Sequence, residues 1–98
     1  MYFITGIHVA KDGDTEIFNE SRCFGFYSSL NVVAYTVETN SCDIFENYYK
    51  YVVIEKINEG IYPEVVFEYW YMWDKAEQSY VAAQKPLCIE HYCNFALG

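Results

Sequence analysis

The sequence predicts a small α+β domain in which one helix packs on a face of an antiparallel sheet of about five strands. Three observations lead to this fold class. Five segments have strand-like patterns, and only residues 30–37 have helical spacing. The resulting order, β-β-α-β-β-β, lacks the strand–helix–strand repeats of a parallel sheet. With 98 residues, the chain is expected to form a single domain, residues 1–98.

The first two strands are expected to form a hairpin. Residues 1–10 alternate in strand fashion, and the Asp-Gly pair within KDGDT is typical of a tight turn. The second strand is predicted from Arg22 to Tyr27. Gly25 lies inside it between Phe24 and Phe26, and a glycine at such a position indicates a bulge or a close backbone approach.

The helix is predicted directly after this hairpin. Ser28 or Ser29 can cap it, because a serine hydroxyl accepts hydrogen bonds from the free amides of a first turn. Its apolar residues share one face, and Asn40 marks its end. Asp43 is expected to start one further helical turn. The residues of the apolar face are Leu30, Val33, Ala34 and Val37.

Three more strands and a tail complete the predicted fold. Residues 50–57 are rich in β-branched side chains, and NEG follows them as a turn. The aromatic segment 64–73 forms the next strand, and DKAE joins it to a short strand from Gln78 to Ala82 as a second hairpin. Lys85 and Pro86 interrupt the pattern, so no regular structure is predicted for the tail that follows.

The aromatic strand EVVFEYWYMW has large apolar side chains on both of its sides. It is therefore either covered on both sides, or covered on one side and exposed to a partner on the other. We expect Trp70 and Met72, with Val66, to pack beneath the helix, which leaves Tyr69, Tyr71 and Trp73 on the opposite side. The reverse assignment stays open, because the Tyr69 side has more rings and would also suit a core.

The chain is strongly acidic. Fourteen acidic residues against six basic ones give a net charge of -8. Nucleic-acid binding is not expected, since it depends on Lys and Arg, whereas an acidic surface favours basic partners. No apolar run has the length of a membrane helix and no signal peptide is recognisable, so we expect a cytoplasmic protein without membrane contact. Seven of the acids lie between residues 12 and 49, with one base: Asp12, Asp14, Glu16, Glu20, Glu38, Asp43 and Glu46.

Several motifs resemble a group of small uncharacterised proteins of Gram-positive bacteria and their phages or mobile elements. The resemblance spans roughly residues 1–85 and departs in the acidic first turn and the tail. It implies a compact fold and a mobile-element setting, but no established reaction. The motifs are Phe24-Gly25-Phe26, Asn40, Asp43-Ile44-Phe45-Glu46, Tyr49-Lys50-Tyr51-Val52-Val53-Ile54-Glu55 and Gly60-Ile61-Tyr62-Pro63.

No metal or cofactor site is predicted. Asp12, Asp14 and Glu16 alternate as in a calcium loop, but Ile17 and Cys23 occupy the positions of its required Gly and Glu. Cys88, His91 and Cys93 match no standard zinc spacing, although an irregular tail could gather them with Cys23 or Cys42. Without a secretion signal, Cys23 and Cys42 are instead expected to be free thiols buried as small apolar groups.

These observations favour a non-catalytic protein-binding module over an enzyme, since no recognisable catalytic motif is present. The hypothesis is an inhibitor of a host defence system, anti-CRISPR-like, whose acidic surface mimics or occludes nucleic acid at a basic effector. The alternatives are a cellular adaptor or homo-oligomer, such as a dimer, whose aromatic face self-associates, and a small zinc protein. The expected partner-binding residues are Asp12, Asp14, Glu16, Glu20, Glu46, Tyr69, Tyr71 and Trp73.

Overall fold

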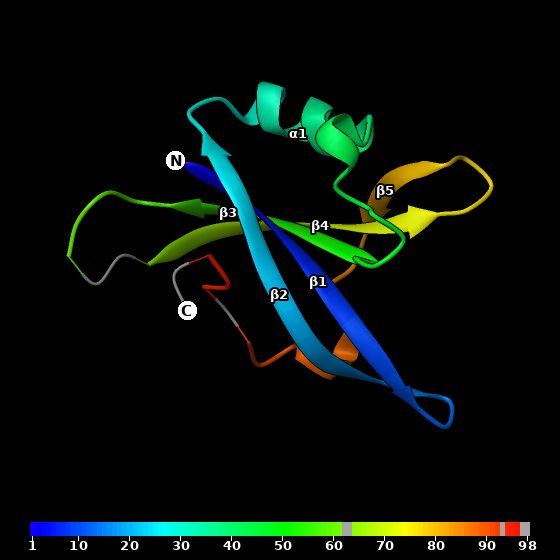
Figure 1. Cartoon of the computed structure of the whole chain (residues 1–98). Helices are drawn as coiled ribbons and strands as arrows, with labels where there is room; N and C mark the ends of the chain where they lie inside the picture. The colour runs from blue at the N-terminus through cyan, green and yellow to red at the C-terminus, as the bar shows by residue number, and fades with distance from the viewer. Residues whose placement is uncertain (62–63, 93, 97–98) are drawn as a thin grey trace.

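The computed structural model describes residues 1–61, 64–92 and 94–96 and has one antiparallel sheet in the order β2-β1-β3-β4-β5 (Figure 1). The single α-helix of the described residues, α1, packs on one face of this sheet. The predicted fold class is therefore confirmed. The elements are β1 (Tyr2–Asp12), β2 (Thr15–Tyr27), α1 (Leu30–Glu38), η1 (Ser41–Asp43), β3 (Tyr51–Ile57), β4 (Val65–Asp74), β5 (Ser79–Ala83) and η2 (Leu87–Ile89).

Strands β1 and β2 form a long hairpin that extends beyond the rest of the sheet. β1 pairs with β3 only from Tyr2 to Ile7, whereas it pairs with β2 as far as Asp12. Gly13 makes the turn with φ 67°, a left-handed conformation that glycine adopts without steric cost. The second strand consequently begins at Thr15 and not at Arg22, because it continues to pair with β1 up to the turn.

Two bulges interrupt β2, at Asn19 and at Phe24, where the register against β1 shifts by one residue. The second bulge places the Phe24 ring over Gly6 of β1. A Cβ atom built on Gly6 would lie 2.7 Å from Phe24 and 2.9 Å from Tyr49, so only glycine fits beneath these two rings. The Phe24 and Tyr49 rings meet edge to face with centroids 5.3 Å apart.

Helix α1 begins after Ser29, which has extended backbone angles. Ser29 occupies the predicted N-cap position. Its side chain makes no capping hydrogen bond, so the prediction that its hydroxyl caps the helix is wrong. Val33 and Val37 are fully buried, as the apolar spacing predicts. No helix among the described residues is long and apolar enough to span a membrane.

The segment after α1 reverses direction through Asn40, which is left-handed with φ 50°. The Asn40 side-chain oxygen accepts a hydrogen bond of 3.0 Å from the Phe45 amide and so closes the turn. The helical turn predicted to start at Asp43 instead ends there, since η1 spans Ser41–Asp43.

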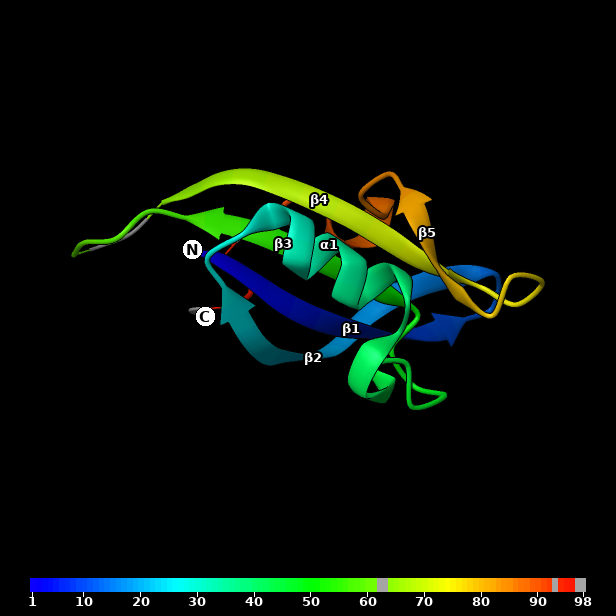
Figure 2. The same ribbon diagram turned by 90° about the horizontal axis from the view of Figure 1, so that it is seen from above.

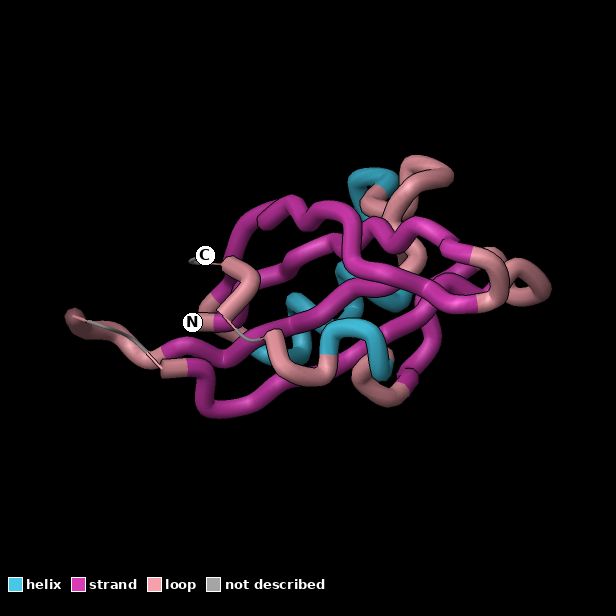
Figure 3. The backbone as a smooth tube through the Cα atoms, turned by 90° about the horizontal axis from the view of Figure 1, so that it is seen from below, coloured by secondary structure: helices cyan, strands magenta, loops and turns pink. Residues whose placement is uncertain are grey.

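The sheet separates two small apolar cores (Figures 2 and 3). On one face, α1 packs over side chains of β1, β3 and β4, including Ile4, Val52 and Tyr71. On the other face, the segment after β5 covers Ile7, Val53 and Trp70. Figure 3 shows this segment in front of the strands, so the aromatic strand is covered on both sides at Trp70 and Tyr71. Val66, expected from the sequence to pack beneath the helix, and Phe67 are exposed.

The expected assignment of the two faces of β4 is wrong. Tyr71 is buried in the helix-side core, and Tyr69 and Trp73 pack against that core. Trp70 and Met72 lie on the opposite face. The strand alternation itself is as predicted, but it fixes only which side chains share a face. Pairing with β3 decides which of the two faces lies under the helix. Val52 packs with α1, and Tyr71 is its pairing partner and shares that face.

The tail is held on the sheet by a buried carboxylate and by apolar contacts. Glu55 of β3 is fully buried and accepts hydrogen bonds of 3.0 Å from the amides of Phe95 and Ala96. Burial raises the pKa of Glu55, and the two amide bonds only partly offset this effect. Ile89 of η2 is also fully buried, and Lys85 forms an ion pair of 3.3 Å with Glu68.

Candidate protein-binding site

The protruding end of the β1–β2 hairpin carries four of the expected partner-binding acids. Asp12 and Asp14 flank the Gly13 turn and are exposed, and Glu20 is exposed farther along β2. Glu16 is half-buried. We call these four residues the acidic hairpin. The turn at Gly13 is as the sequence predicts, and this turn and the strands that it joins carry all four acids because β2 extends back to Thr15.

Glu16 is the one acid of this group that is neutralised within the chain. Its carboxylate accepts hydrogen bonds from Lys50 Nζ at 2.5 Å and from Tyr51 Oη at 2.6 Å. Burial opposes ionisation of Glu16, but these two bonds and the charges of Lys50 and Lys11 together outweigh it and hold the pKa of Glu16 below the ordinary value. Hydrogen bonding to Glu16 raises the pKa of Lys50, while burial and the same carboxylate raise that of Tyr51.

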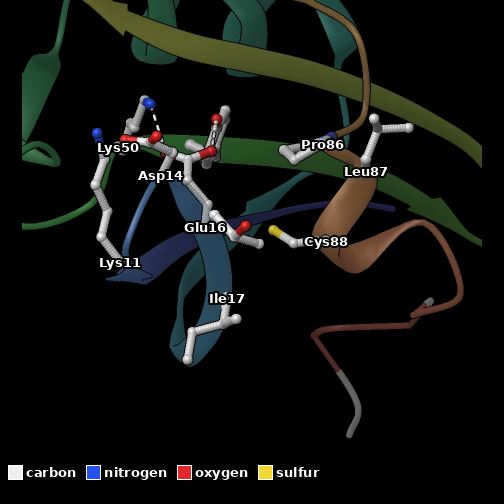
Figure 4. Close-up of a pocket in the computed structure, with 10 residues that line it drawn as sticks. Lys11, Asp14, Glu16, Ile17, Lys50, Pro86, Leu87 and Cys88 are labelled. Carbon is white, nitrogen blue, oxygen red and sulfur yellow. Dashed lines mark hydrogen bonds and ion pairs between the residues drawn. The ribbon is translucent and has the colours of Figure 1, made fainter.

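This cluster forms part of the wall of an open hollow of about 740 Å³. Figure 4 shows Lys11, Asp14 and Lys50 on one side, Pro86, Leu87 and Cys88 on the other, and Glu16 between them. The hollow lies where the hairpin meets η2.

Four ionisable groups that line the hollow have shifted pKa values: Glu16, Lys50, Tyr51 and Cys88. A general acid or base works best with a pKa near the working pH, yet the pKa values of Glu16 and Lys50 are shifted away from neutrality. Burial and the nearby Glu16 charge raise the pKa of the Cys88 thiol, which keeps it protonated, whereas nucleophilic cysteines need the thiolate. The geometry therefore supports a fixed ion pair that braces the hairpin.

Loop residues 44–49 lie against the hairpin. The Tyr48 hydroxyl donates a hydrogen bond to Glu20, which raises the pKa of Tyr48 to about 12. The Tyr48 ring stacks on His8 with centroids 3.9 Å apart, and His8 Nδ1 is hydrogen-bonded to Asn19 at 2.8 Å. Glu46 is exposed in this loop, two residues before Tyr48, and so joins the same end of the molecule.

The aromatic part of the expected binding site is not an open face. Tyr71 is 8% exposed beneath α1, Tyr69 packs against the same core, and Trp73 stacks on Phe45 with centroids 4.0 Å apart. Their rings complete the core that the helix covers. Tyr69, Tyr71 and Trp73 therefore do not form the open aromatic face that the self-associating adaptor hypothesis assumes.

Among the cysteines and histidines, the structure places Cys23 on the exposed face of β2, so the expectation that it is buried is wrong. Cys88 is half-buried and His91 is exposed beside Glu90. Cys93 and the side chain of Cys42 lie outside the described residues. Within the described part of the chain, no group of three or more His, Cys, Asp or Glu side chains could hold a metal ion.

Sequence reasoning missed Lys50, Tyr51 and Cys88 as residues of this region. Lys50 and Tyr51 meet Glu16 across 34 and 35 positions of the chain, and such a contact depends on sheet order. A single lysine beside a strongly acidic segment was the only feature of the sequence that indicated this ion pair.

The described residues define a class of protein: a small α+β fold with a single sheet, one α-helix on one face and the segment after β5 on the other. Comparison with known proteins finds no match to this chain among family models, curated proteins or solved structures. The resemblance to small proteins of Gram-positive bacteria and their mobile elements stays a prediction.

Proposed function

We propose that the protein is a non-catalytic module that binds a basic protein surface through its acidic hairpin. The observation that carries the proposal is the protruding hairpin end, where β1 no longer pairs with β3 and Asp12, Asp14 and Glu20 are exposed without an ion-pair partner among the described residues. The Glu20 carboxylate also accepts a hydrogen bond from Tyr48, which leaves its charge in place. A projecting element with uncompensated charge can enter a concave partner.

The charge density of the hairpin indicates which basic surfaces it fits. Glu20 pairs with His8, four residues from Asp12 along β1, which corresponds to about 13 Å of strand. Asp12, Asp14 and Glu20 carry three negative charges over this length, and Lys11 of the same hairpin offsets one of them. The net density is one charge per ~6.5 Å, half that of the phosphates along one DNA strand and a quarter of that of a duplex. The hairpin therefore suits a groove that holds a single strand better than one that holds a duplex.

In a phage or mobile-element setting, such a module would inhibit a nucleic-acid-binding defence effector by occupying its basic channel. A CRISPR effector is the proposed target class, because it holds its guide–target heteroduplex and the displaced strand against positively charged surfaces. The protein then acts in the cytoplasm of the host cell and requires no cofactor.

The test is competition for nucleic acid. Increasing amounts of the protein are added to a guide-loaded CRISPR effector, and the binding of labelled target DNA is measured. We expect displacement of the DNA, slower association at higher salt, and about tenfold weaker inhibition by the Asp12→Asn/Asp14→Asn variant. Glu59→Gln/Glu64→Gln is the matched control, since it removes two exposed acids from the β3–β4 connection at the other end of β3.

Two results would contradict the proposal. Equal loss of inhibition in both double variants would assign the effect to net charge alone. An absence of displacement across a panel of such effectors would remove the acidic hairpin as their competitor.

A further inference from the structure

A second hollow, of about 370 Å³, lies on the helix-covered side of the hairpin. Its volume is within the range of small-molecule sites, roughly 300 to 1,000 Å³. It is built where the hairpin, the loop before β3 and the β4–β5 turn converge. We call it the lysine–aromatic hollow, and the residues that line it are His8, Val9, Lys11, Glu16, Phe45, Asn47, Tyr48, Lys50, Trp73 and Lys75.

Basic side chains gather at this hollow although the chain is acidic overall. Lys11, Lys50 and Lys75 are three of the six basic residues of the sequence. Glu16 is the only acid that lines the hollow, and Lys50 already neutralises it. Lys11 and Lys75 are exposed and form no ion pair with any residue that the structure describes. Lys11 lies opposite Glu16 in the β1–β2 pair and its charge helps to lower the pKa of that carboxyl, but Lys50 is the cation bonded to Glu16. The charges of Lys11 and Lys75 together match that of a phosphate monoester.

Flat rings form the rest of the wall. Phe45 stacks on Trp73 with the ring planes within 6°, and His8 stacks on Tyr48 with the planes within 2°. Both pairs line the hollow. Parallel rings at a concave surface offer planar area for a nucleobase, whose binding by stacking depends little on the identity of the base.

The surroundings of the hollow restrict the size of the ligand. Glu20 and Glu46 lie close to its Tyr48 and Phe45 walls, and the acidic hairpin continues beyond Lys11. A polynucleotide that entered here would bring further phosphates against these carboxylates. A ligand with one phosphate group avoids that repulsion.

We propose that the lysine–aromatic hollow is a binding site for a mononucleotide, with the phosphate between Lys11 and Lys75 and the base against the rings of Phe45, Trp73 and Tyr48. This site differs from the proposed surface for a basic partner, because it uses lysines and rings in place of the exposed acids and shares only Glu16 with the acidic hairpin.

The two tryptophans provide a readout with an internal control. Trp73 lines the hollow, whereas Trp70 lies on the opposite face of the sheet beneath the tail. Titration of the isotope-labelled protein with adenosine monophosphate, followed by the two indole N–H signals in NMR spectra, should shift the Trp73 signal and leave that of Trp70 in place. Adenosine alone and ribose 5-phosphate alone should each bind more weakly than the whole nucleotide.

Lysine variants test the phosphate contact. Lys75→Ala removes an exposed turn residue and should weaken binding of adenosine monophosphate about fivefold, as expected for one partly screened ion contact. Lys56→Ala is the matched control, because it removes the same charge at the opposite end of β3, beside Tyr2 and Phe67, and should leave binding unchanged.

Three outcomes would overturn the proposal. The first is an unmoved Trp73 signal at millimolar nucleotide. The second is equal weakening by Lys75→Ala and Lys56→Ala, which would reflect net charge. The third is tighter binding of a short oligonucleotide than of the mononucleotide.

Discussion

The buried hydroxyl of Tyr80 offers a sharp test of how the loop before β3 is held. Tyr80 is 1% exposed, and its hydroxyl donates a hydrogen bond of 2.6 Å to the backbone carbonyl of Tyr49. This bond joins β5 to the segment that also carries Phe45 and Tyr48. Burial raises the pKa of Tyr80 well above the ordinary value, so the hydroxyl stays protonated and able to donate.

Tyr80→Phe keeps the ring and removes only this donor. The carbonyl of Tyr49 then stays buried without the hydroxyl, and such a loss costs about 1 to 3 kcal/mol. For a domain of this size, each kcal/mol lowers the melting temperature by roughly 4 to 8 °C. We therefore expect the variant to melt about 5 to 20 °C below the wild-type protein.

The measurement is urea and thermal unfolding followed by far-UV circular dichroism. An unchanged slope of the unfolding free energy against urea would show that variant and wild type have equivalent folded and unfolded states. Tyr48→Phe is the matched control, because the Tyr48 hydroxyl bonds to Glu20 at the surface and its loss should leave stability nearly unchanged. If the two variants have the same stability, or if Tyr80→Phe loses less than about 0.5 kcal/mol, the buried bond does not hold the loop.

Three further predictions follow from the two cores. Trp70→Ala and Tyr71→Ala should each lower the free energy of unfolding by ~3 to 5 kcal/mol, since the two rings are buried on opposite faces of β4. An unchanged melting temperature of either variant would show that the face of β4 carrying that ring is open. Gly6→Ala should cost about 1 to 3 kcal/mol in chemical unfolding because its Cβ would clash with Phe24 and Tyr49, and wild-type stability would refute that packing. Because burial raises the pKa of Glu55, the stability that this group contributes is complete below its ordinary pKa of 4.5 and is lost as the pH rises through the raised value. Glu55→Gln cannot ionise, but its NH2 group cannot accept one of the amide bonds from Phe95 and Ala96, so the variant should be less stable than the wild type in acid. Its stability should not fall further as the pH rises through the raised value; a fall like that of the wild type would show that another group is responsible.

Local patterns predicted the elements of the fold because each depends on neighbouring residues. The Asp-Gly turn, the helical spacing of Val33 and Val37, and the β-branched run before Ile57 all lie where the pattern placed them. Strand alternation also separated Trp70 from Tyr71 correctly. It could not tell which ring faces the helix, because that choice is made by pairing with β3.

The second core was not predictable from local pattern. The tail has no periodicity, and its place is fixed by Glu55, which lies about 40 residues earlier in the chain. Cys23 was misjudged for a related reason. Its sequence neighbours are apolar, but successive side chains of a strand point to opposite faces. Cys23 lies on the edge strand β2 and its side chain is exposed.

The candidate site was predicted in its charge and not in its geometry. Composition and the turn at Gly13 place Asp12, Asp14 and Glu20 together at one end of the molecule. The pairing of Glu16 with Lys50 and the gathering of Lys11 and Lys75 near Trp73 depend on long-range contacts. The sequence therefore indicated an acidic surface and gave no sign of the basic hollow beside it.

The two bulges of β2 also influence how the protein behaves in concentrated solution. β2 is a 13-residue strand at the sheet edge, and a long regular edge is a template for pairing with another chain. The bulge at Asn19 and the charges of Glu20 and Arg22 interrupt that template along much of its length. Beyond the second bulge, Phe26 and Tyr27 are exposed without a charged neighbour on the strand. This end of β2 is therefore where edge-to-edge pairing with another chain is expected, and Phe26→Lys would place a charge there at the cost of one ring contact with Phe3, outside both cores.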